Sequence, residues 1–217
     1  AGVDHLVLRS HAGAIGAAAL FGAAVRLGLF SACSTASSRR LAKKRAVGGG
    51  CVTISRMSIT SDAQRAIMRT WATGVTIVTT HHDGHDHGLT VSSFTSVSLE
   101  PPQVLVVIAK IRRTLPLLRA SRLFGVNVLR NDQLALSNRF ANYATEDADR
   151  FEDLTVIRGR TGVPLIPDSL AYLECEVVDE FDAGNNVIVL GQVVAGEVKA
   201  GQPLLYWDRN YRQLIDS

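Results

Sequence analysis

The chain has 217 residues, of which 47% are apolar and 20% charged, so it can bury a core of ordinary globular composition. Its net charge of +3 is unevenly spread. Residues 1–56 hold eight Lys/Arg and one acidic residue, whereas residues 57–217 hold fifteen Lys/Arg and nineteen Asp/Glu. This acidic excess argues against nucleic acid as a partner, because that affinity depends on clustered cations. The three widely spaced cysteines argue against a zinc site or a disulfide framework.

Residues 1–56 are predicted to be a leader or extension that is disordered or not native to the mature protein. Residues 12–30 form a long apolar run, but Arg26 interrupts it, which makes it a marginal membrane span. The segment that follows is rich in Ser and basic residues, as in a transit peptide or a stretch translated ahead of the true start. We expect a domain over residues 57–217 with no membrane partner. Its predicted location is cytoplasmic, or organellar if the leader is a transit peptide.

The first part of this domain is predicted to form a short helix and then strands. In chain order we expect a helix over 62–71, a strand over 75–80, a hairpin loop over 81–88 and a strand over 89–99. Asp62 is the expected helix cap, and Asp83-Gly84 is typical of a tight turn. Four histidines in the loop invite a metal site (His81, His82, His85 and His87). We interpret them instead as exposed loop side chains, because no apolar shell fixes their geometry.

The second part is predicted to be mostly strands. We expect a strand over 104–108, a helix capped by Thr114, a strand over 124–129, a helix from about 131 to 143, and strands over 170–180, 186–198 and 203–214. Cys175 falls in an alternating run and is interpreted as a buried apolar residue. Seven or so strands with few short helices predict an all-β fold, an antiparallel barrel or sandwich. Motifs for a Rossmann or P-loop nucleotide site are absent from the sequence.

Two stretches are candidates for a binding site. Seven of the eleven residues in 88–98 are Gly, Ser or Thr, which can donate hydrogen bonds to a phosphate or a ring carbonyl. The run Lys110-Ile111-Arg112-Arg113-Thr114 places three cations at a helix start, where an anion would be stabilised. An edge strand with a solvated face and a solvated surface cluster remain the alternative interpretations.

Several motifs have a recognisable pattern and order. They are ATGVTIVTT (72–80), HGLTVSSFTSVSLEPPQVLVV (87–107), KIRRTLPLL (110–118), FGVNVL (124–129) and PLLYWDRNYRQL (203–214). Together they resemble the flavin reductase-like family of FMN-binding split barrels, which includes reductase components of two-component flavin monooxygenases. The resemblance covers about residues 62–215. It implies a homodimer of six-stranded antiparallel Greek-key barrels, with flavin bound near the dimer interface.

The resemblance also implies a set of cofactor-binding residues. For the flavin these are Thr90, Val91, Ser92, Ser93, Ser96, Ala109, Lys110, Arg113, Thr114 and Asn127. The family usually carries Gly-Asp-His before its long sixth strand, and that His is implicated in nicotinamide binding. Here the match is Gly184-Asn185-Asn186, and Asn186 can donate a hydrogen bond but cannot titrate near neutrality. Arg209 and Tyr211 are further candidates for contacts with the second nucleotide.

The implied function is an NAD(P)H-dependent flavin reductase that transfers a hydride to FMN or FAD and supplies a partner monooxygenase. No catalytic side chain and no metal are expected, since the cofactors supply the chemistry. The Asn186 departure keeps a second function open, a flavin-binding electron-transfer protein that does not use NAD(P)H. A third possible function is the binding of a cofactor other than flavin in the barrel. The sequence does not decide between NADH and NADPH, or between FMN and FAD.

Overall fold

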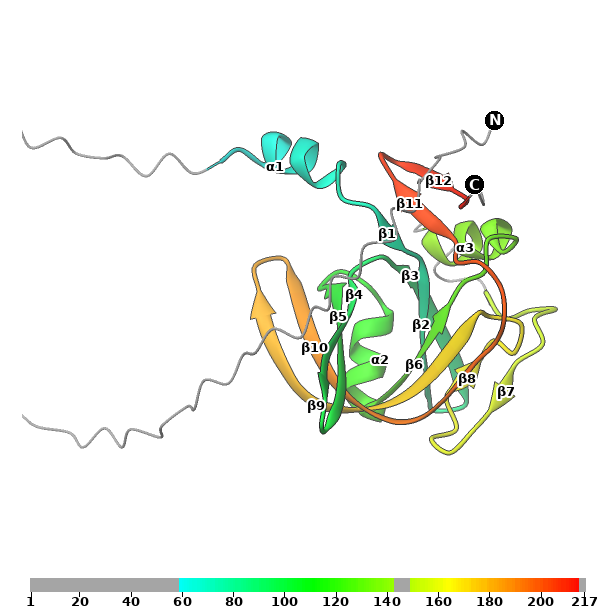
Figure 1. The fold of residues 1–217 in the computed structure, drawn as a ribbon. Coiled ribbons are helices and arrows are strands. Elements are labelled where there is room, and N and C mark those ends of the chain that lie inside the picture. Colours follow the sequence, from blue (N-terminus) through cyan, green and yellow to red (C-terminus); the bar gives the residue numbers. More distant parts are fainter. Residues whose placement is uncertain (1–58, 143–148, 215–217) are drawn as a thin grey trace, which may run out of the picture. The chain divides into compact units, whose positions relative to one another are not determined.

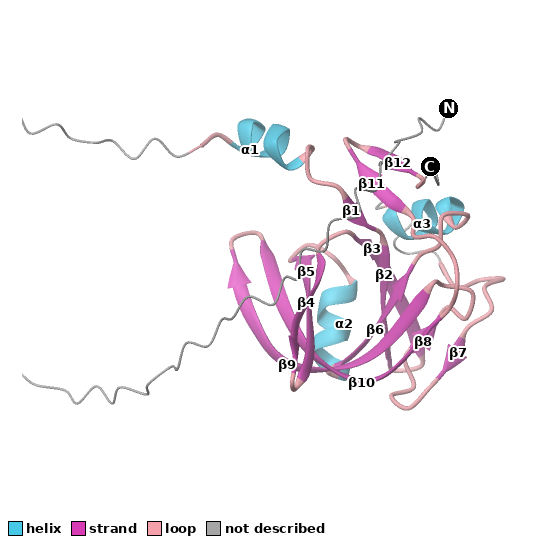
Figure 2. Cartoon of the chain, viewed as in Figure 1, coloured by secondary structure: helices cyan, strands magenta, loops and turns pink. Residues whose placement is uncertain are grey.

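The structure, a computed structural model, describes residues 59–142 and 149–214, so the predicted leader lies outside the described residues. From Thr60 on, these residues belong to one compact unit. Strands dominate this unit, with three short helices in its described parts (Figure 2). None of the helices in the described ranges is long and apolar enough to cross a membrane.

Seven antiparallel strands form the main sheet, in the order β3-β2-β6-β9-β10-β5-β4. The strands are β2 (Thr76–His82), β3 (His85–Val91), β4 (Phe94–Leu99), β5 (Pro102–Ala109), β6 (Leu123–Val128), β9 (Ala171–Ala183) and β10 (Asn186–Val198). The sheet curves around helix α2 (Thr114–Ser121), as Figure 1 shows. The predicted all-β barrel fold is confirmed. The resemblance implies a barrel of six strands, and the main sheet contains seven.

The core lies between the curved sheet and α2. Leu115 and Leu118 of α2 are at most 2% exposed and pack against apolar side chains of the strands. Phe124 and Cys175 are fully buried in the same cluster, so the prediction for Cys175 is confirmed. Burial raises the pKa of the Cys175 thiol to about 12, which makes it a poor nucleophile. This core fixes the strands that carry the site.

The remaining elements lie at the margins of the barrel. They are α1 (Ser61–Met68), β1 (Thr73–Gly74), α3 (Leu134–Ala141), β7 (Ile157–Arg158), β8 (Pro164–Leu165), β11 (Leu205–Trp207) and β12 (Asn210–Arg212). Strands β1, β11 and β12 form a small sheet of their own, and β7 pairs with β8. A second apolar cluster, which includes Leu129, Phe140 and Leu204, packs α3 and the C-terminal segment onto β2.

Three predicted segments differ from the structure. The expected loop over 81–88 is largely strand, because Asp83 and Gly84 adopt φ of 48° and 79° and close the hairpin in two residues. The expected strand over 89–99 is two strands, β3 and β4, interrupted at Ser92 and Ser93. This interruption accounts for the additional strand. The segment over 203–214 likewise contains two strands.

The helix caps also differ from prediction. Thr60, not Asp62, caps α1, and its Oγ1 accepts a hydrogen bond from Ala63 N at 3.2 Å. At α2 the capping position is Arg113, and Thr114 is the first helical residue, 1% exposed. The cap lies two residues before the predicted one at α1 and one residue before it at α2.

Candidate functional site

A groove opens where β3 passes into β4. It consists of three adjoining hollows of about 440, 250 and 180 Å³, all of which include Ser92 in their lining. We call it the Ser92 groove. Its lining residues come from the β1 segment, from β3 and β4, from the end of β5, and from the α3 and C-terminal segments. Several segments far apart in sequence therefore converge on one serine.

Hydrogen bonds to neighbouring backbone hold the β3–β4 corner in place. Thr90 Oγ1 donates to Ser137 O at 2.7 Å, which ties β3 to α3. Ser93 Oγ donates to Val107 O at 3.0 Å and accepts from Val107 N at 3.3 Å, which ties the corner to β5. Ser92 lies exposed between these two anchored residues. Its hydroxyl is thus presented to the groove by a fixed backbone.

Arg112 provides the positive charge of the groove. A turn after β5, in which Arg112 N donates to Ala109 O at 2.9 Å, brings the residue back toward β3. Arg112 is 6% exposed and lines two of the three hollows together with Thr90 and Ser92. Among the described lining residues it is the one charged side chain. Its planar guanidinium carries a fork of N–H donors that fits the oxygen atoms of a phosphate.

Two tyrosines form the aromatic side of the groove. The rings of Tyr206 and Tyr211 meet edge to face with centroids 5.3 Å apart, and both line the hollow that contains Arg112. The hydroxyl groups of Tyr211 and Ser137 lie 2.9 Å apart and share a hydrogen bond. Since Ser137 also accepts from Thr90, the aromatic and hydroxyl sides are connected through one residue of α3.

The structure brings about half of the predicted site residues together. Those that line the Ser92 groove are Thr90, Val91, Ser92, Ser93, Ala109, Asn186 and Tyr211. Asn186 lies directly opposite Ala109 in the β5–β10 pairing. The hydroxyl-rich stretch and the segment after β5, which the sequence analysis named as separate candidates, therefore line one groove.

Other predicted residues lie outside the lining of this groove: Ser96, Lys110, Arg113, Thr114, Asn127 and Arg209. Lys110 Nζ pairs with Asp182 Oδ1 at 2.9 Å, and this hydrogen bond holds the pKa of Asp182 below its usual value. Asn127 is fully buried, where its Nδ2 donates to Ile77 O and its Oδ1 accepts from Ile166 N. Its amide clamps three core segments.

Sequence reasoning did not select Arg112, Tyr206 or Trp71 as site residues. Arg112 stands within the predicted cationic run, so its residue type was noticed, but the choice among three adjacent cations depends on the turn after β5. Tyr206 lines two grooves, the Ser92 groove and a second groove beside α1. Trp71 lines the largest hollow and the same α1 groove, and nothing in its local sequence marks it as a site residue.

The histidine-rich hairpin does not assemble a ligand set. Among the described residues no group of three or more His, Cys, Asp or Glu side chains could hold a metal ion. His81 Nδ1 lies 2.6 Å from Asp86 Oδ1, and the same carboxylate pairs with Arg158 Nη2 at 2.7 Å. His81 and His82 are half-buried at the end of β2 and His85 is exposed, so the predicted exposed loop is only partly observed.

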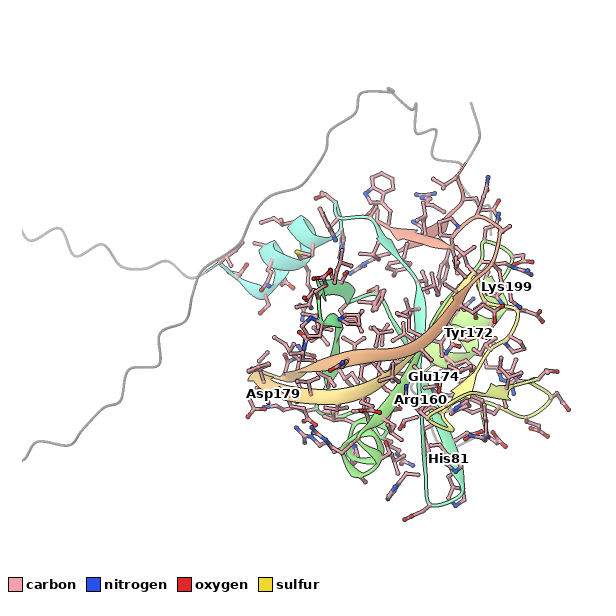
Figure 3. All side chains as sticks on the ribbon, turned by 60° about the horizontal axis from the view of Figure 1, so that its bottom comes forward. His81, Arg160, Tyr172, Glu174, Asp179 and Lys199 are labelled. Atoms are coloured by element: carbon pink, nitrogen blue, oxygen red, sulfur yellow. The ribbon has the colours of Figure 1, made fainter. Side chains whose placement is uncertain are left out.

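The buried carboxylate of Glu174, in the barrel wall, is held by hydrogen bonds from a neighbouring loop. Glu174 is 3% exposed and accepts hydrogen bonds from Arg160 N at 3.0 Å and from Thr161 N and Oγ1, both at 2.6 Å. Figure 3 shows Glu174 and Arg160 side by side. Burial acts to raise the pKa of Glu174, but the hydrogen bonds from Thr161 and Arg160, together with the charge of Arg160, outweigh it and the net shift of the pKa is downward. The carboxylate anchors the 159–161 loop.

The groove thus combines hydroxyl donors, a buried guanidinium and an aromatic side. These groups fit a phosphorylated aromatic ligand, since hydroxyls and Arg bind phosphate and tyrosine rings contact a planar ring system. Flavin mononucleotide has this chemistry. The described lining residues are therefore compatible with the flavin that the resemblance implies.

Comparison with known proteins identifies the family. Residues 68–214 match the flavin reductase like domain, so the chain belongs to that family. The chain is 39% identical over 151 residues to the reductase component of 4-nitrophenol 4-monooxygenase/4-nitrocatechol 2-monooxygenase of Rhodococcus opacus, covering 70% of this chain and 80% of that protein. It is 43% identical over 158 residues to the NADH flavin reductase of Kitasatospora aureofaciens, covering 70% and 81%.

A solved structure shares the fold. BorF, the flavin reductase component of a bacterial two-component tryptophan halogenase, superposes with a TM-score of 0.67 at 36% identity, covering 73% of this chain and all of that chain. The predicted family and split-barrel fold are confirmed, and with them the enzyme class, an oxidoreductase of the flavin reductase type.

Proposed function

We propose that this chain reduces FMN or FAD with NADH and releases the reduced flavin to a separate oxygenase. One observation carries the proposal: the hydroxyl-rich β3–β4 corner and the buried Arg112 line one groove, within the fold of a flavin reductase. NADH is proposed over NADPH because the Kitasatospora relative is an NADH flavin reductase. The oxygenase partner is proposed because the Rhodococcus relative is the reductase component of a monooxygenase.

The residues of the groove would bind and orient the two substrates. Reduced nicotinamide supplies a hydride and the flavin accepts it, a transfer that needs no acid or nucleophile from the protein. Arg112 would hold the flavin phosphate, and the Ser92 hydroxyl and the neighbouring backbone would donate hydrogen bonds to the flavin. Tyr206 and Tyr211 would border the ring system and limit access of water. The protein thus contributes proximity and orientation.

Steady-state oxidation of NADH, followed by loss of absorbance with FMN, FAD or riboflavin as acceptor, tests this function. We expect turnover that depends on added flavin. The same assay with NADPH decides the donor. The proposal fails if none of the three flavins supports oxidation of either nicotinamide while the protein is folded.

Asn186 supports a second candidate, a flavin-binding electron-transfer protein that does not use NADH. Asn186 lines the groove beside Ala109 and Arg112, at the position where the family usually carries His. Its side chain donates to Asn185 Oδ1 at 2.9 Å and cannot take up a proton near neutral pH. Tight flavin binding without NADH oxidation would select this candidate. Asn186→His would then be expected to confer NADH oxidation.

We further propose a homodimer. Strand β4 is an edge of the main sheet, and its Val97 and Leu99 are 48% and 84% exposed. An exposed apolar edge is a surface that a second copy would cover, and the Ser92 groove adjoins the same strand. Light scattering coupled to gel filtration should give twice the chain mass. A monomer at micromolar concentration, with full flavin affinity, would exclude a dimer that completes the site.

The cytoplasm is the proposed location, since NADH, the proposed electron donor, is available there. Fractionation of cells that express the full chain, with immunodetection, tests the location. Recovery in an organelle would support the alternative of a transit peptide in residues 1–56.

A further inference from the structure

A second groove lies between α1 and the β11–β12 hairpin, beside the site already described. It measures about 310 Å³ and is lined by Arg65, Met68, Arg69, Trp71, Tyr206, Asp208 and Arg209. We call it the α1 groove. Figure 1 shows α1 and the hairpin at the same end of the barrel. The family match begins at residue 68, so Arg65 and most of α1 lie ahead of the conserved domain.

Hydrogen bonds join the two walls of the α1 groove. Trp207 Nε1 donates to Thr70 O and Asp208 N donates to Arg69 O, both at 3.2 Å. The guanidinium of Arg212 lies 5.4 Å from the centre of the Trp207 ring and supports the hairpin from the other side. The end of α1 is therefore docked onto the hairpin rather than extending free from it.

The hairpin turn has a conformation that stability alone does not favour. Asp208 and Arg209 occupy its two central positions with φ of 46° and 63°, where glycine or asparagine is usual. Non-glycine residues adopt this left-handed conformation at a cost in free energy. Such strain is commonly retained where a turn must present particular side chains. Here the turn presents Arg209 to the α1 groove.

The lining has the chemistry of a site for an adenine nucleotide. Arg65 and Arg69 are four residues apart, so they project from one face of α1, and Arg209 faces them from the hairpin. Trp71, which is 67% exposed, and Tyr206 offer aromatic surfaces for a purine. Asp208 also lines the groove, and Asp62 pairs with Arg65 at 2.7 Å, so a net positive charge of one to two remains.

The α1 groove adjoins the Ser92 groove, because two residues line both. Tyr206 lines both the α1 groove and the hollow that contains Arg112, and Trp71 lines both the α1 groove and the largest hollow. A ligand that occupies the Ser92 groove with one end can therefore reach the α1 groove with the other. A dinucleotide is a molecule of this form.

We propose that the α1 groove binds the adenosine diphosphate end of a dinucleotide whose redox-active end lies in the Ser92 groove. This inference rests on the proposed function. The phosphates would pair with Arg65, Arg69 and Arg209, and the adenine would contact Trp71 or Tyr206. Both NADH and FAD contain this adenosine diphosphate group. FMN and riboflavin lack it, which makes the two grooves separable by experiment.

Titration of the full chain with ADP, followed by calorimetry, tests the α1 groove directly. We expect binding that weakens with rising salt, since the three arginines lie at the surface. The double variant Arg65→Ala/Arg69→Ala should raise the Kd for ADP by about tenfold or more, and Trp71→Ala by about threefold or more. The Kd of the double variant for riboflavin, measured by quenching of riboflavin fluorescence, should differ from that of wild type by less than twofold. Arg119→Ala, which removes an exposed arginine paired with Glu180, is the matched control.

The source of the adenosine diphosphate follows from two further measurements. If FAD occupies the α1 groove, wild type should bind FAD more tightly than FMN, and the double variant should lose that preference. If NADH occupies it, the double variant should raise the KM for NADH with FMN as acceptor and leave the ratio of FAD to FMN affinity unchanged. Either result supports the proposal.

The proposal is overturned if ADP does not bind, or if the double variant binds ADP as wild type does. Both results leave the proposed flavin reductase intact as long as riboflavin and FMN still bind. Loss of riboflavin and FMN binding in wild type would instead remove the proposed function itself.

Discussion

Ala109 and Asn186 lie directly opposite each other where β5 ends and β10 begins, and beyond this pair the chain turns so that Arg112 lines the Ser92 groove. Just beyond it, Lys110 N donates to Asn185 O at 3.0 Å, which directs Lys110 toward Asp182 on the hairpin. The same turn returns Arg112 to the side of Ala109. Of the two cations, only Arg112 lines the groove in the described structure.

The first prediction contrasts these two cations. Arg112→Ala should raise the Kd for FMN by roughly tenfold to a hundredfold, because a hydrogen bond to a charged group contributes about 1.5–3 kcal/mol. Lys110→Ala should change it less than threefold. Riboflavin has no phosphate, so its Kd should be similar in wild type and both variants. Quenching of flavin fluorescence measures the Kd values for FMN and riboflavin in wild type and in both variants.

Because Arg112 is buried, its variants need a check on folding. Thermal unfolding should show that Arg112→Lys and Arg112→Ala retain a cooperative transition, and Arg112→Lys should recover part of the FMN affinity. If Lys110→Ala weakens FMN binding and Arg112→Ala does not, the phosphate is held by Lys110, one of the flavin-binding residues that the resemblance implies, and the proposed role of Arg112 is wrong.

Ser92→Asp is the second prediction. A carboxylate at this exposed position would repel the flavin phosphate, and we expect the Kd for FMN to rise about tenfold or more. Ser96→Asp introduces the same charge on β4, outside the lining of the groove, and should change the Kd less than threefold. Equal effects of the two substitutions would show that the phosphate does not lie closer to Ser92 than to Ser96. The Kd values come from fluorescence titration at constant ionic strength.

The sequence predicted the fold class and most strands, because alternating and continuous apolar runs reflect burial directly. The strand expected over 186–198 is observed with those bounds. What it could not predict was where a strand breaks. The interruption at Ser92 and Ser93 depends on a hydrogen bond from Ser93 to Val107, a residue fourteen positions away. Local propensity contains no information about that partner.

The site was predictable at the level of segments and less so at the level of residues. The hydroxyl-rich stretch and the cationic run were both identified, and the structure brings them together. Within the cationic run, the resemblance implied Lys110 as a flavin-binding residue, but Arg112 is the cation that lines the groove. The reason is a turn in which Arg112 N donates to Ala109 O, three residues earlier in the chain. Asn127 was assigned to the pocket from the family motif, yet the structure buries its amide among backbone partners. Such choices follow from tertiary contacts that a motif does not encode.

Glu174 leads to the third prediction, a dependence of stability on pH. Its folded-state pKa lies below the ordinary value of 4.5, so its stabilising effect is present above that value and is lost as the pH falls through the lowered pKa. At pH 7, Glu174→Gln should lower the free energy of unfolding by about 1–3 kcal/mol, because the amide cannot accept all three hydrogen bonds. The difference in free energy of unfolding between wild type and Glu174→Gln should become smaller below about pH 4.5.

Urea unfolding from pH 7 to pH 3 measures this difference. Glu176→Gln changes the exposed neighbour two residues along β9 and is the matched control, with an expected effect below about 0.5 kcal/mol. If the difference between wild type and Glu174→Gln stays constant over the whole pH range, the carboxylate does not anchor the 159–161 loop through its charge.

The fourth prediction concerns the barrel interior, where Gly191 on β10 faces the ring of Phe124 on β6. A Cβ at position 191 would lie 2.5 Å from Phe124 Cε1 and 3.1 Å from Cys175 Cβ, closer than packed atoms tolerate. Gly191→Ala should therefore lower the free energy of unfolding by about 1–3 kcal/mol. Gly74→Ala, at a position with no atom within 4 Å of the added Cβ, should change it by less than about 0.5 kcal/mol.

A second substitution distinguishes overpacking from a loss of backbone freedom. Phe124→Leu shortens the side chain that the new methyl group would meet, so it should offset part of the cost of Gly191→Ala. In a double-mutant cycle by urea unfolding, the two changes should couple by about 0.5–3 kcal/mol. Strict additivity would mean that Gly191 is needed for its backbone conformation and not for the space that Phe124 fills.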